Sequence, residues 1–306
     1  MSIVSGDLRG SQMRSRSLTP SEPVCQPECM KQSVDLSGTA FCDVDASGYA
    51  GDFITYLDQA ADHFRPLKLL THLLLRLRPG ERILDVGCGC GDDLRELATL
   101  VAPNGCAVGI DRSQSMIDEA RQRNAGCELP LQFEPGDAGH LRWHSDYFDA
   151  CRADRVFQHL PDPQRALNEM IRVLKPGGRV LIVDRDWGMV AVDASDAATT
   201  RVVLNRACAG IRNGWMGRGL GGLFRKAGVI NAEVQTKSIS INSFAVADTL
   251  LDLRVVLDHA IAEKLVSQDV GAKWLNDLLD RDAASKFFAT VTLYIACGSK
   301  KLSAGA

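Results

Sequence analysis

The stretch RILDVGCGCGDD, residues 82–93, decides the fold. Its first five residues suit a short buried strand, and glycines then occupy every second position at Gly87, Gly89 and Gly91. Two acids open the next segment, which has helical spacing to about Val101. Glycine is needed where the backbone takes positive φ and approaches a ligand closely. A strand, a glycine turn and a helix in this order predict a ligand site at the carboxyl ends of parallel strands.

Strands and helices alternate along the segment that follows. The hydrophobic pattern predicts strands at 106–110, 131–134, 148–153 and 179–184, with helices at about 113–124 and 164–174. Strands that alternate with helices on short connections become parallel and are covered on both faces. The sequence therefore predicts a doubly wound α/β fold.

The flanking segments have other patterns. Apolar residues recur at helical spacing from Tyr49 to Leu77, and Pro66 is expected to open a second helix there. Two mainly helical stretches, 194–228 and 244–286, surround a strand near 232–241, and a last strand covers 288–296. We divide the chain into a flexible N-terminal arm at 1–35, N-terminal helices of a cap at 36–80, an α/β core at 81–185, and the rest of the sheet with helical cap insertions at 186–306.

Charge and hydrophobic pattern indicate which kinds of molecule the protein can bind. The 306 residues include 35 Lys and Arg against 38 Asp and Glu, a formal charge of −3. Phosphate backbones need a clustered basic surface, so we expect a small-molecule substrate and no nucleic acid. No apolar run reaches the roughly 20 residues that span a bilayer. We expect a cytoplasmic protein, with homo-oligomers possible. The Arg and Ser residues within 1–24 leave a transit peptide open.

The ten cysteines lack the paired spacing of zinc sites, so no metal is expected. Reduced thiols that act as small apolar groups are the favoured interpretation. Cys25 and Cys29, with Cys42 nearby, could still form a thiol site.

The glycine turn distinguishes between two classes of cofactor. The dinucleotide pattern G-x-G-x-x-G would need glycine at position 92, where the chain has Asp92. Asp92 and Asp93 would also repel a diphosphate at the helix start. A cofactor without phosphates, carrying an ammonium and a sulfonium, fits better. Asp111, at the end of the second strand, can accept both ribose hydroxyls, and Asp137, after the third strand, can accept from an adenine amino group.

A set of motifs resembles the class I S-adenosylmethionine-dependent methyltransferases. More narrowly, it resembles the branch with the ubiquinone/menaquinone C-methyltransferases and many natural-product methyltransferases. The resemblance covers about residues 50–185. The matching segments are 83–91, 109–111, 136–138, 148–149, 157–160 (FQHL) and 172–178 (RVLKPGG). It implies a seven-stranded, mostly parallel sheet whose last strand, residues 288–296, is antiparallel.

Carried over by position, the resemblance implies S-adenosylmethionine as cofactor and S-adenosylhomocysteine as product. Gly87, Gly89 and Gly91 would line the methionine end, and Asp85 would support their loop. The adenosine end would be held by Asp111 at the ribose, Arg112 and Met116 beside the adenosine, and Asp137 and Ala138 at the adenine. Backbone around Asp154 and Arg155 would meet the methionine amino group.

The chain departs from the family pattern between the last two strands. Many members have a short hairpin there, whereas roughly 45 residues with helical spacing intervene here. With 49–77 and 194–228, this insertion is expected to form a helical cap over the methyl donor. The substrate of the quinone-modifying members is therefore not carried over.

Methyl transfer from a sulfonium needs alignment, exclusion of water and, for some acceptors, a base. His159 is the favoured base because it follows the fourth strand and its ordinary pKa is near 6.5. The alternative is that it only shapes the pocket. Asp184 and His140 are weaker catalytic candidates. The side chains expected to line the substrate pocket are Tyr49, Tyr56, Trp187, Arg212 and Trp215.

The sequence predicts methylation of a carbon, oxygen or nitrogen of a small, partly apolar metabolite, such as a quinone or secondary metabolite. Two alternatives stay open. One is an arsenite methyltransferase that uses convergent thiols. The other is a protein that binds S-adenosylmethionine without methylating, as a regulatory binder or a cyclase.

Overall fold

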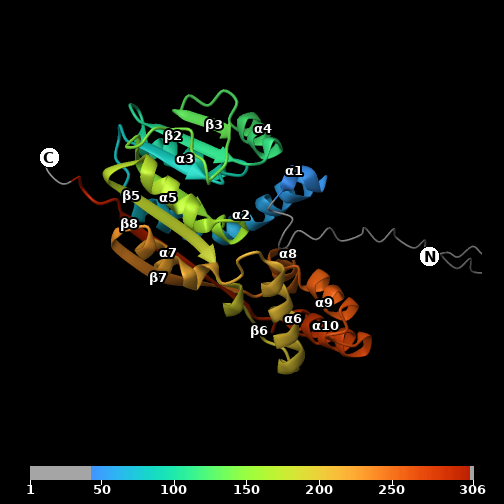
Figure 1. Cartoon of the computed structure of the whole chain (residues 1–306). Coiled ribbons are helices and arrows are strands. Elements are labelled where there is room, and N and C mark those ends of the chain that lie inside the picture. Colours follow the sequence, from blue (N-terminus) through green and yellow to red (C-terminus); the bar gives the residue numbers. More distant parts are fainter. Residues whose placement is uncertain (1–42, 304–306) are drawn as a thin grey trace, which may run out of the picture. The chain divides into compact units, whose positions relative to one another are not determined.

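A computed structural model describes residues 43–303, which contain an eight-stranded sheet (Figure 1). The strands follow the order β3-β2-β1-β4-β5-β8, and both β6 and β7 also pair with β8. Their bounds are β1 Arg82–Val86, β2 Cys106–Asp111, β3 Leu131–Pro135, β4 Phe148–Asp154, β5 Leu174–Arg185, β6 Ala191–Val192, β7 Ile230–Ile241 and β8 Ala289–Ser299.

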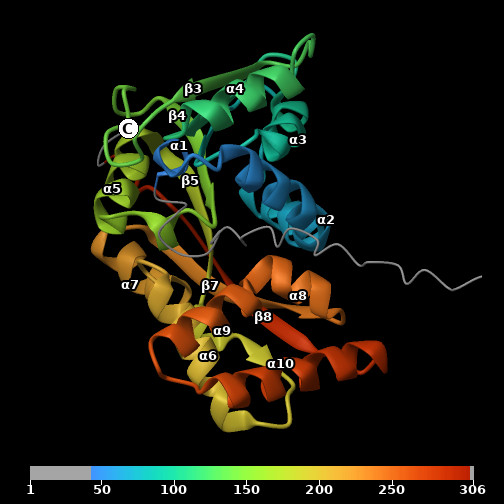
Figure 2. The same ribbon diagram turned by 90° about the vertical axis from the view of Figure 1, so that its right-hand side faces the viewer.

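Helices cover both faces of the sheet, because neighbouring residues of each strand pack to opposite sides. Ile83 and Leu84, adjacent in β1, belong to different hydrophobic clusters. The first cluster receives α2 Ala50–Leu75, α3 Asp92–Val101 and α4 Gln114–Arg123, and the second receives α5 Pro163–Val173 and α7 Met216–Lys226. Figure 2 shows the sheet between these two groups. The predicted doubly wound α/β fold is confirmed.

Strand β8 lies inside the sheet and is antiparallel to its neighbours. It pairs with β7 from Ile241–Ala289 to Ile230–Ser299. On its other side it pairs with β6 at Ala289 and Thr290, and then with β5 from Leu293 to Ser299. The two-residue β6 was not predicted. It continues the line of β5 after a single 3₁₀ turn, η3 Trp187–Met189, and so adds an eighth strand to the seven expected.

The segments flanking β7 are helical, as their spacing indicates. Before β7 lie α6 Ala197–Gly210 and α7, and after it lie α8 Phe244–Leu251, α9 Leu253–Ala262 and α10 Gln268–Ala283. Helices α6, α9 and α10 gather at one end of the sheet (Figure 1). Trp274 of α10 is buried and donates from Nε1 to Thr200 Oγ1 of α6 at 2.8 Å. That these helices form a substrate cap stays a prediction.

The expected helix break at Pro66 is wrong, because α2 continues through it. A short helix, α1 Val44–Ser47, precedes α2. Proline removes one backbone hydrogen bond within a helix. Pro66 is exposed, so water can bind the carbonyl that this leaves without a donor. Meanwhile Phe64 and Leu67, on either side, are buried and hold the helix against the core.

Two expectations fall outside the described residues, namely the flexible arm at 1–35 and the thiol site of Cys25, Cys29 and Cys42. Within residues 43–303, no helix is long and apolar enough to cross a membrane.

Candidate active site

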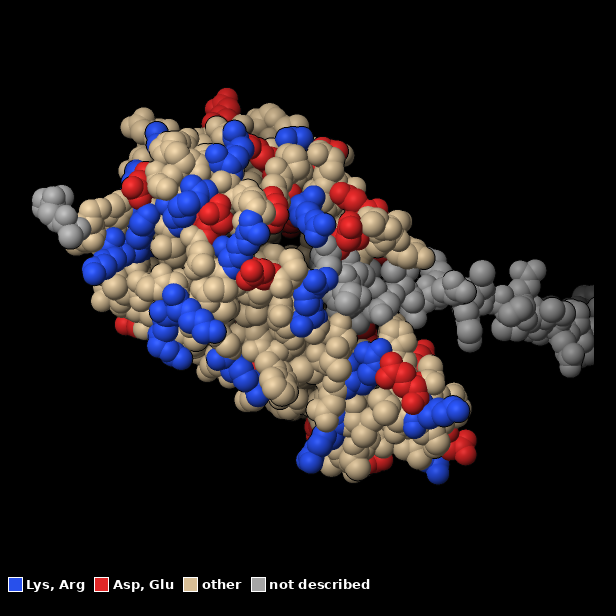
Figure 3. Space-filling view, viewed as in Figure 1, with Lys and Arg blue, Asp and Glu red and all other residues tan. Residues whose placement is uncertain are grey.

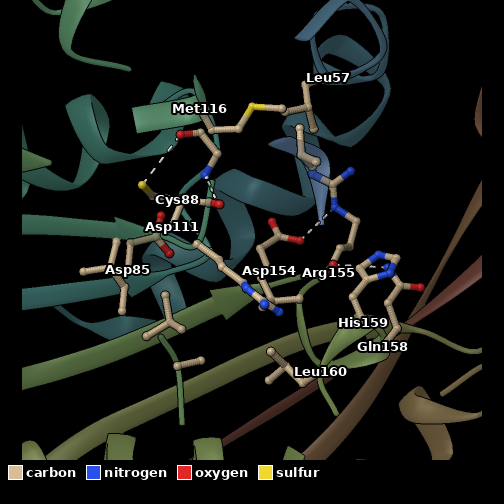
Figure 4. Close-up of a pocket in the computed structure, with 18 of the residues that line it drawn as sticks. Leu57, Asp85, Cys88, Asp111, Met116, Asp154, Arg155, Gln158, His159 and Leu160 are labelled. Carbon is tan, nitrogen blue, oxygen red and sulfur yellow. Dashed lines mark hydrogen bonds and ion pairs between the residues drawn. The ribbon is translucent and has the colours of Figure 1, made fainter. Parts of the chain in front are cut away.

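A cavity of about 500 Å³ lies at the carboxyl ends of β1, β2, β4 and β5. This is the edge at which parallel α/β sheets bind ligands, and the size is that of a small-molecule site. Figure 4 shows side chains from several elements converging there. Of the residues predicted from the sequence, those that line it are Tyr56, Asp85, Gly87, Gly89, Asp111, Arg112, Met116, Asp137, Ala138, Arg155, His159 and Trp187.

The glycine turn after β1 has the backbone that its sequence predicts. Gly87, Gly89 and Gly91 all have positive φ, at 73°, 52° and 77°. A Cβ on Gly87 would clash with Val156, and one on Gly91 would clash with Phe133. A Cβ on Gly89 would meet only a leucine methyl of α2, at 3.4 Å. Gly89 therefore leaves backbone open to the cavity, whereas Gly91 packs beneath the turn and lies outside the lining.

Asp111 ends β2 beside that turn, and two backbone N–H groups hold its carboxylate. Gly89 donates to Oδ2 at 3.0 Å and Ser113 donates to Oδ1 at 2.9 Å. Burial raises the pKa of this carboxyl. The backbone N–H of Arg112 bonds this carboxylate as well. A carboxylate has about four acceptor sites, so these bonds leave room for one more hydroxyl group. Figure 4 shows Asp111 near Asp85 and Cys88.

The loop after β3 places a second carboxylate at the cavity. Asp137 accepts from the Gly139 N–H at 2.8 Å, and His140 Nδ1 lies 3.3 Å from its other oxygen. The Gly139 N–H is the main cause that lowers the pKa of Asp137. His140 is exposed and does not line the cavity.

A buried ionic network supports the glycine turn from below. Arg152 of β4 donates from Nη1 to Asp85 at 3.1 Å, and from Nη2 to Asp93 and Asp154, both at 2.8 Å. Lys68 of α2 lies 2.8 Å from the other oxygen of Asp93. Burial raises the pKa of Asp85 to about 6 despite Arg152. Burial acts on Asp93 too, but Arg152 and Lys68 outweigh it and lower that pKa.

Arg155 follows β4 in a backbone conformation unusual for a residue other than glycine, with φ at 60°. Its N–H donates to Val183 O at 2.8 Å, and its Nε donates to Asp154 Oδ1 at 3.0 Å. Its guanidinium lies 4.3 Å from the ring centre of Phe64. The turn thus lies in the cavity lining while these contacts fix the side chain.

The other half of the cavity is more apolar. A 3₁₀ turn, η2 Phe157–His159, places His159 in the lining next to Gln158 and Leu160 (Figure 4). Gln158 accepts from Trp187 Nε1 at 2.7 Å, which orients the indole. Ile211, Leu250 and Asp252 also line this side.

The comparisons with known proteins agree with this geometry. A family model described as a methyltransferase domain matches residues 77–213. The chain is 38% identical over 247 residues to an uncharacterized 37.1 kDa protein in a transposon of Streptomyces fradiae, covering 80% of this chain and 70% of that protein. It is also 38% identical over 109 residues to the 2-phytyl-1,4-naphthoquinone methyltransferase of Synechococcus elongatus. The chain belongs to the class I S-adenosylmethionine-dependent methyltransferases.

The match to the naphthoquinone methyltransferase is partial, since it covers 35% of this chain and 47% of that enzyme. Among solved structures, the YcgJ protein of Bacillus subtilis aligns with a TM-score of 0.54 at 20% identity. That alignment covers 78% of this chain and 98% of the other, and at this identity it supports the fold alone.

Besides Gly91 and His140, four residues predicted for the site of this methyltransferase lie outside the cavity lining. Asp184 is fully buried, and its carboxylate accepts from the backbone N–H groups of Gln158 and Arg185, each at 2.9 Å. Burial raises its pKa to about 7. Tyr49 and Arg212 are exposed, and Trp215 is 63% exposed, beneath a neighbouring guanidinium.

Three cations of the site were missed from the sequence, namely Lys68, Arg152 and Arg185. Arg152 and Arg185 sit in the buried parts of their strands, where a charge is costly unless it is paired. That unusual placement is the one signal that could have found them.

The described cysteines are all reduced thiols. Cys88 and Cys90 line the cavity, and burial raises their thiol pKa values, that of Cys90 to about 12. These two thiols therefore stay protonated at neutral pH.

Proposed function

We propose that this chain transfers a methyl group from S-adenosylmethionine to a carbon, oxygen or nitrogen of a small, partly apolar metabolite. The observation that carries the proposal is the pairing of Asp111 with the open glycine turn. The carboxylate is fixed by Gly89 N–H and Ser113 N–H and lines the cavity. It retains acceptor capacity for a ribose hydroxyl.

The residues present fit this cofactor. Gly87 and Gly89 would lie along its methionine part, Asp111 at the ribose, and Arg112, Met116, Asp137 and Ala138 around the adenosine. The backbone turn at Asp154 and Arg155 would receive the amino group. When bound, the cofactor supplies an electrophilic methyl group.

The protein's own residues supply the other requirements of methyl transfer. The apolar half of the cavity excludes water and aligns the nucleophile. Where the acceptor must lose a proton, His159 takes it at a ring nitrogen. Figure 3 shows Lys and Arg side chains dispersed over one face, with Asp and Glu among them, which favours a small acceptor over nucleic acid.

Calorimetric titration tests the donor site. We expect the intact protein to bind S-adenosylmethionine and S-adenosylhomocysteine with micromolar affinity. Asp111→Ala should weaken both by at least about tenfold, which corresponds to about 1.4 kcal/mol. Asp118→Ala, on the exposed surface of α4, is the matched control and should bind normally.

Absence of binding by the intact protein would contradict the proposal, and binding of NADH instead would indicate a dehydrogenase. Transfer of label from the methyl group to a metabolite extract then separates a methyltransferase from a protein that binds the cofactor without methylating.

A further inference from the structure

Arg185 brings a buried positive charge to the apolar half of the cavity. It is the last residue of β5, it is 3% exposed, and it lines the cavity near Trp187 and Leu250. Burial of a guanidinium is costly unless opposite charge and hydrogen bonds offset it. The partners of Arg185 therefore show whether a negative charge within the protein already neutralises it.

Its partners are neutral. Nη1 donates to Leu250 O at 3.0 Å, and Nη2 donates to the Tyr56 hydroxyl at 3.2 Å. The guanidinium also lies 5.1 Å from the ring centre of Phe64 and 5.3 Å from that of Trp187. Nε is buried without a hydrogen-bond partner. These bonds use two of the five N–H donors of an arginine.

The other buried arginines of the cavity differ in this respect. Arg152 and Arg155 both form ion pairs with Asp154. Among the residues that the structure describes, Arg185 forms no ion pair. Asp184, its neighbour in sequence, receives the backbone N–H of Arg185 and not its side chain. Leu250 O, near the end of α8, contributes only the partial negative charge of a helix C-terminus.

The surroundings hold the guanidinium in place. Hydrogen bonds from two separate helices and two aromatic rings fix it before any ligand arrives. A planar guanidinium whose position is fixed matches a carboxylate better than a flexible ammonium does. The ring of Trp187, which lines the cavity beside the guanidinium, suits an apolar, planar skeleton.

We propose that the methyl acceptor carries a carboxylate on an aromatic skeleton, and that Arg185 binds this carboxylate inside the cavity. The inference rests on the proposed function, since it names the substrate class of the same site. Arg185 would be a specificity residue that anchors the acceptor, while His159 faces the reacting end.

The carboxylate of the methyl donor is the competing ligand. The glycine turn follows β1, and Arg185 ends β5, which is two strands away in the order β1-β4-β5. Two strand spacings amount to roughly 10 Å. This separation favours the acceptor, and the experiment below measures both ligands.

The test uses aromatic acids and their matched amides as probes. Benzoate, 1-naphthoate and indole-3-acetate, each with its primary amide, are titrated calorimetrically into protein saturated with S-adenosylhomocysteine. We expect at least one acid to bind tenfold or more tightly than its amide. Arg185→Gln should remove that preference and leave S-adenosylhomocysteine affinity within threefold of the wild type. Arg206→Gln, whose arginine pairs with Glu263 outside the cavity, should keep it.

Equal binding of acids and amides to the wild type, or no binding of any acid, would overturn the proposal. This comparison needs no variant, so it holds even if Arg185→Gln does not fold. A tenfold loss of S-adenosylhomocysteine affinity in a folded Arg185→Gln would assign the arginine to the donor instead. Failure of the wild type to bind S-adenosylhomocysteine would contradict the proposed function itself, which is a separate result.

Discussion

At the scale of single residues, the cavity contains charges that are satisfied within the protein and side chains that can still act. Asp85, Asp93 and Asp154 are committed to Arg152, so they support the glycine turn rather than react. His159 lines the opposite side and is the histidine of the cavity lining. It is therefore the residue on which catalysis of proton transfer is best tested.

His159→Gln should lower kcat by about 100-fold or more if the acceptor must be deprotonated, because a positioned base contributes about that factor. The affinity for S-adenosylhomocysteine should not change. Labelled methyl transfer, measured across pH, gives the rate, and the fall in rate toward acidic pH that protonation of a general base causes should disappear in the variant. His144→Gln, at an exposed position, is the control. Unchanged kcat in His159→Gln would leave this residue with a role in pocket shape only.

The residues found from the sequence and those missed differ in where their partners lie. Gly87, Gly89 and Asp111 follow strands whose ends must meet, so a local pattern was enough. Arg152 pairs with Asp85 across 67 positions, and Arg185 bonds Tyr56 across 129. A single sequence holds no signal for pairs this distant, so the partners of the buried cations follow only from the assembled strands.

At the scale of elements, hydrophobic period predicted almost every helix and strand, and the exceptions have local causes. The sequence predicts a helix boundary at Pro66 because proline removes a backbone hydrogen bond. Pro66 is exposed, so water can replace that bond and the helix continues. Strand β6 was missed because two residues are too short to show a period. Its pairing with β8 is set by the partner strand and not by its own sequence.

The contact between α6 and α10 allows a stability test. Trp274 is 2% exposed and bonds Thr200, whereas Trp215 is 63% exposed. Trp274→Ala should lower the free energy of unfolding by about 3–5 kcal/mol because it leaves a cavity and removes the hydrogen bond to Thr200. Trp215→Ala should cost less than about 1 kcal/mol. Urea unfolding of both variants measures this, and equal losses would contradict the packing described for α10.

At the scale of the whole described molecule, the buried carboxyl groups make the free energy of unfolding depend on pH. Burial raises the pKa of Asp85 to about 6 and that of Asp184 to about 7. An unfolded aspartate has a pKa near 3.9. Between about pH 4 and pH 7 the folded state therefore holds protons that the unfolded state has released, so these groups reduce stability as pH rises.

Asp184→Asn removes one such group. The free energy of unfolding of the wild type, minus that of the variant, should fall between about pH 5 and pH 7, at up to about 1.4 kcal/mol per pH unit. Urea unfolding at several pH values measures the difference. Asp118→Asn, at an exposed position, should track the wild type throughout. A constant difference between wild type and Asp184→Asn would show that Asp184 ionises normally.

The position of β8 determines the order in which the sheet can be completed. This strand lies between β5 and β7, and it is made after both of them. While the chain emerges from the ribosome, the edges of β5 and β7 that pair with β8 therefore stay unpaired until β8 is made. Unpaired edges and exposed apolar surface favour aggregation in a nascent chain. The part of the sheet from β1 to β5 can pair early, whereas β7 pairs only when the last strand is inserted between it and β5.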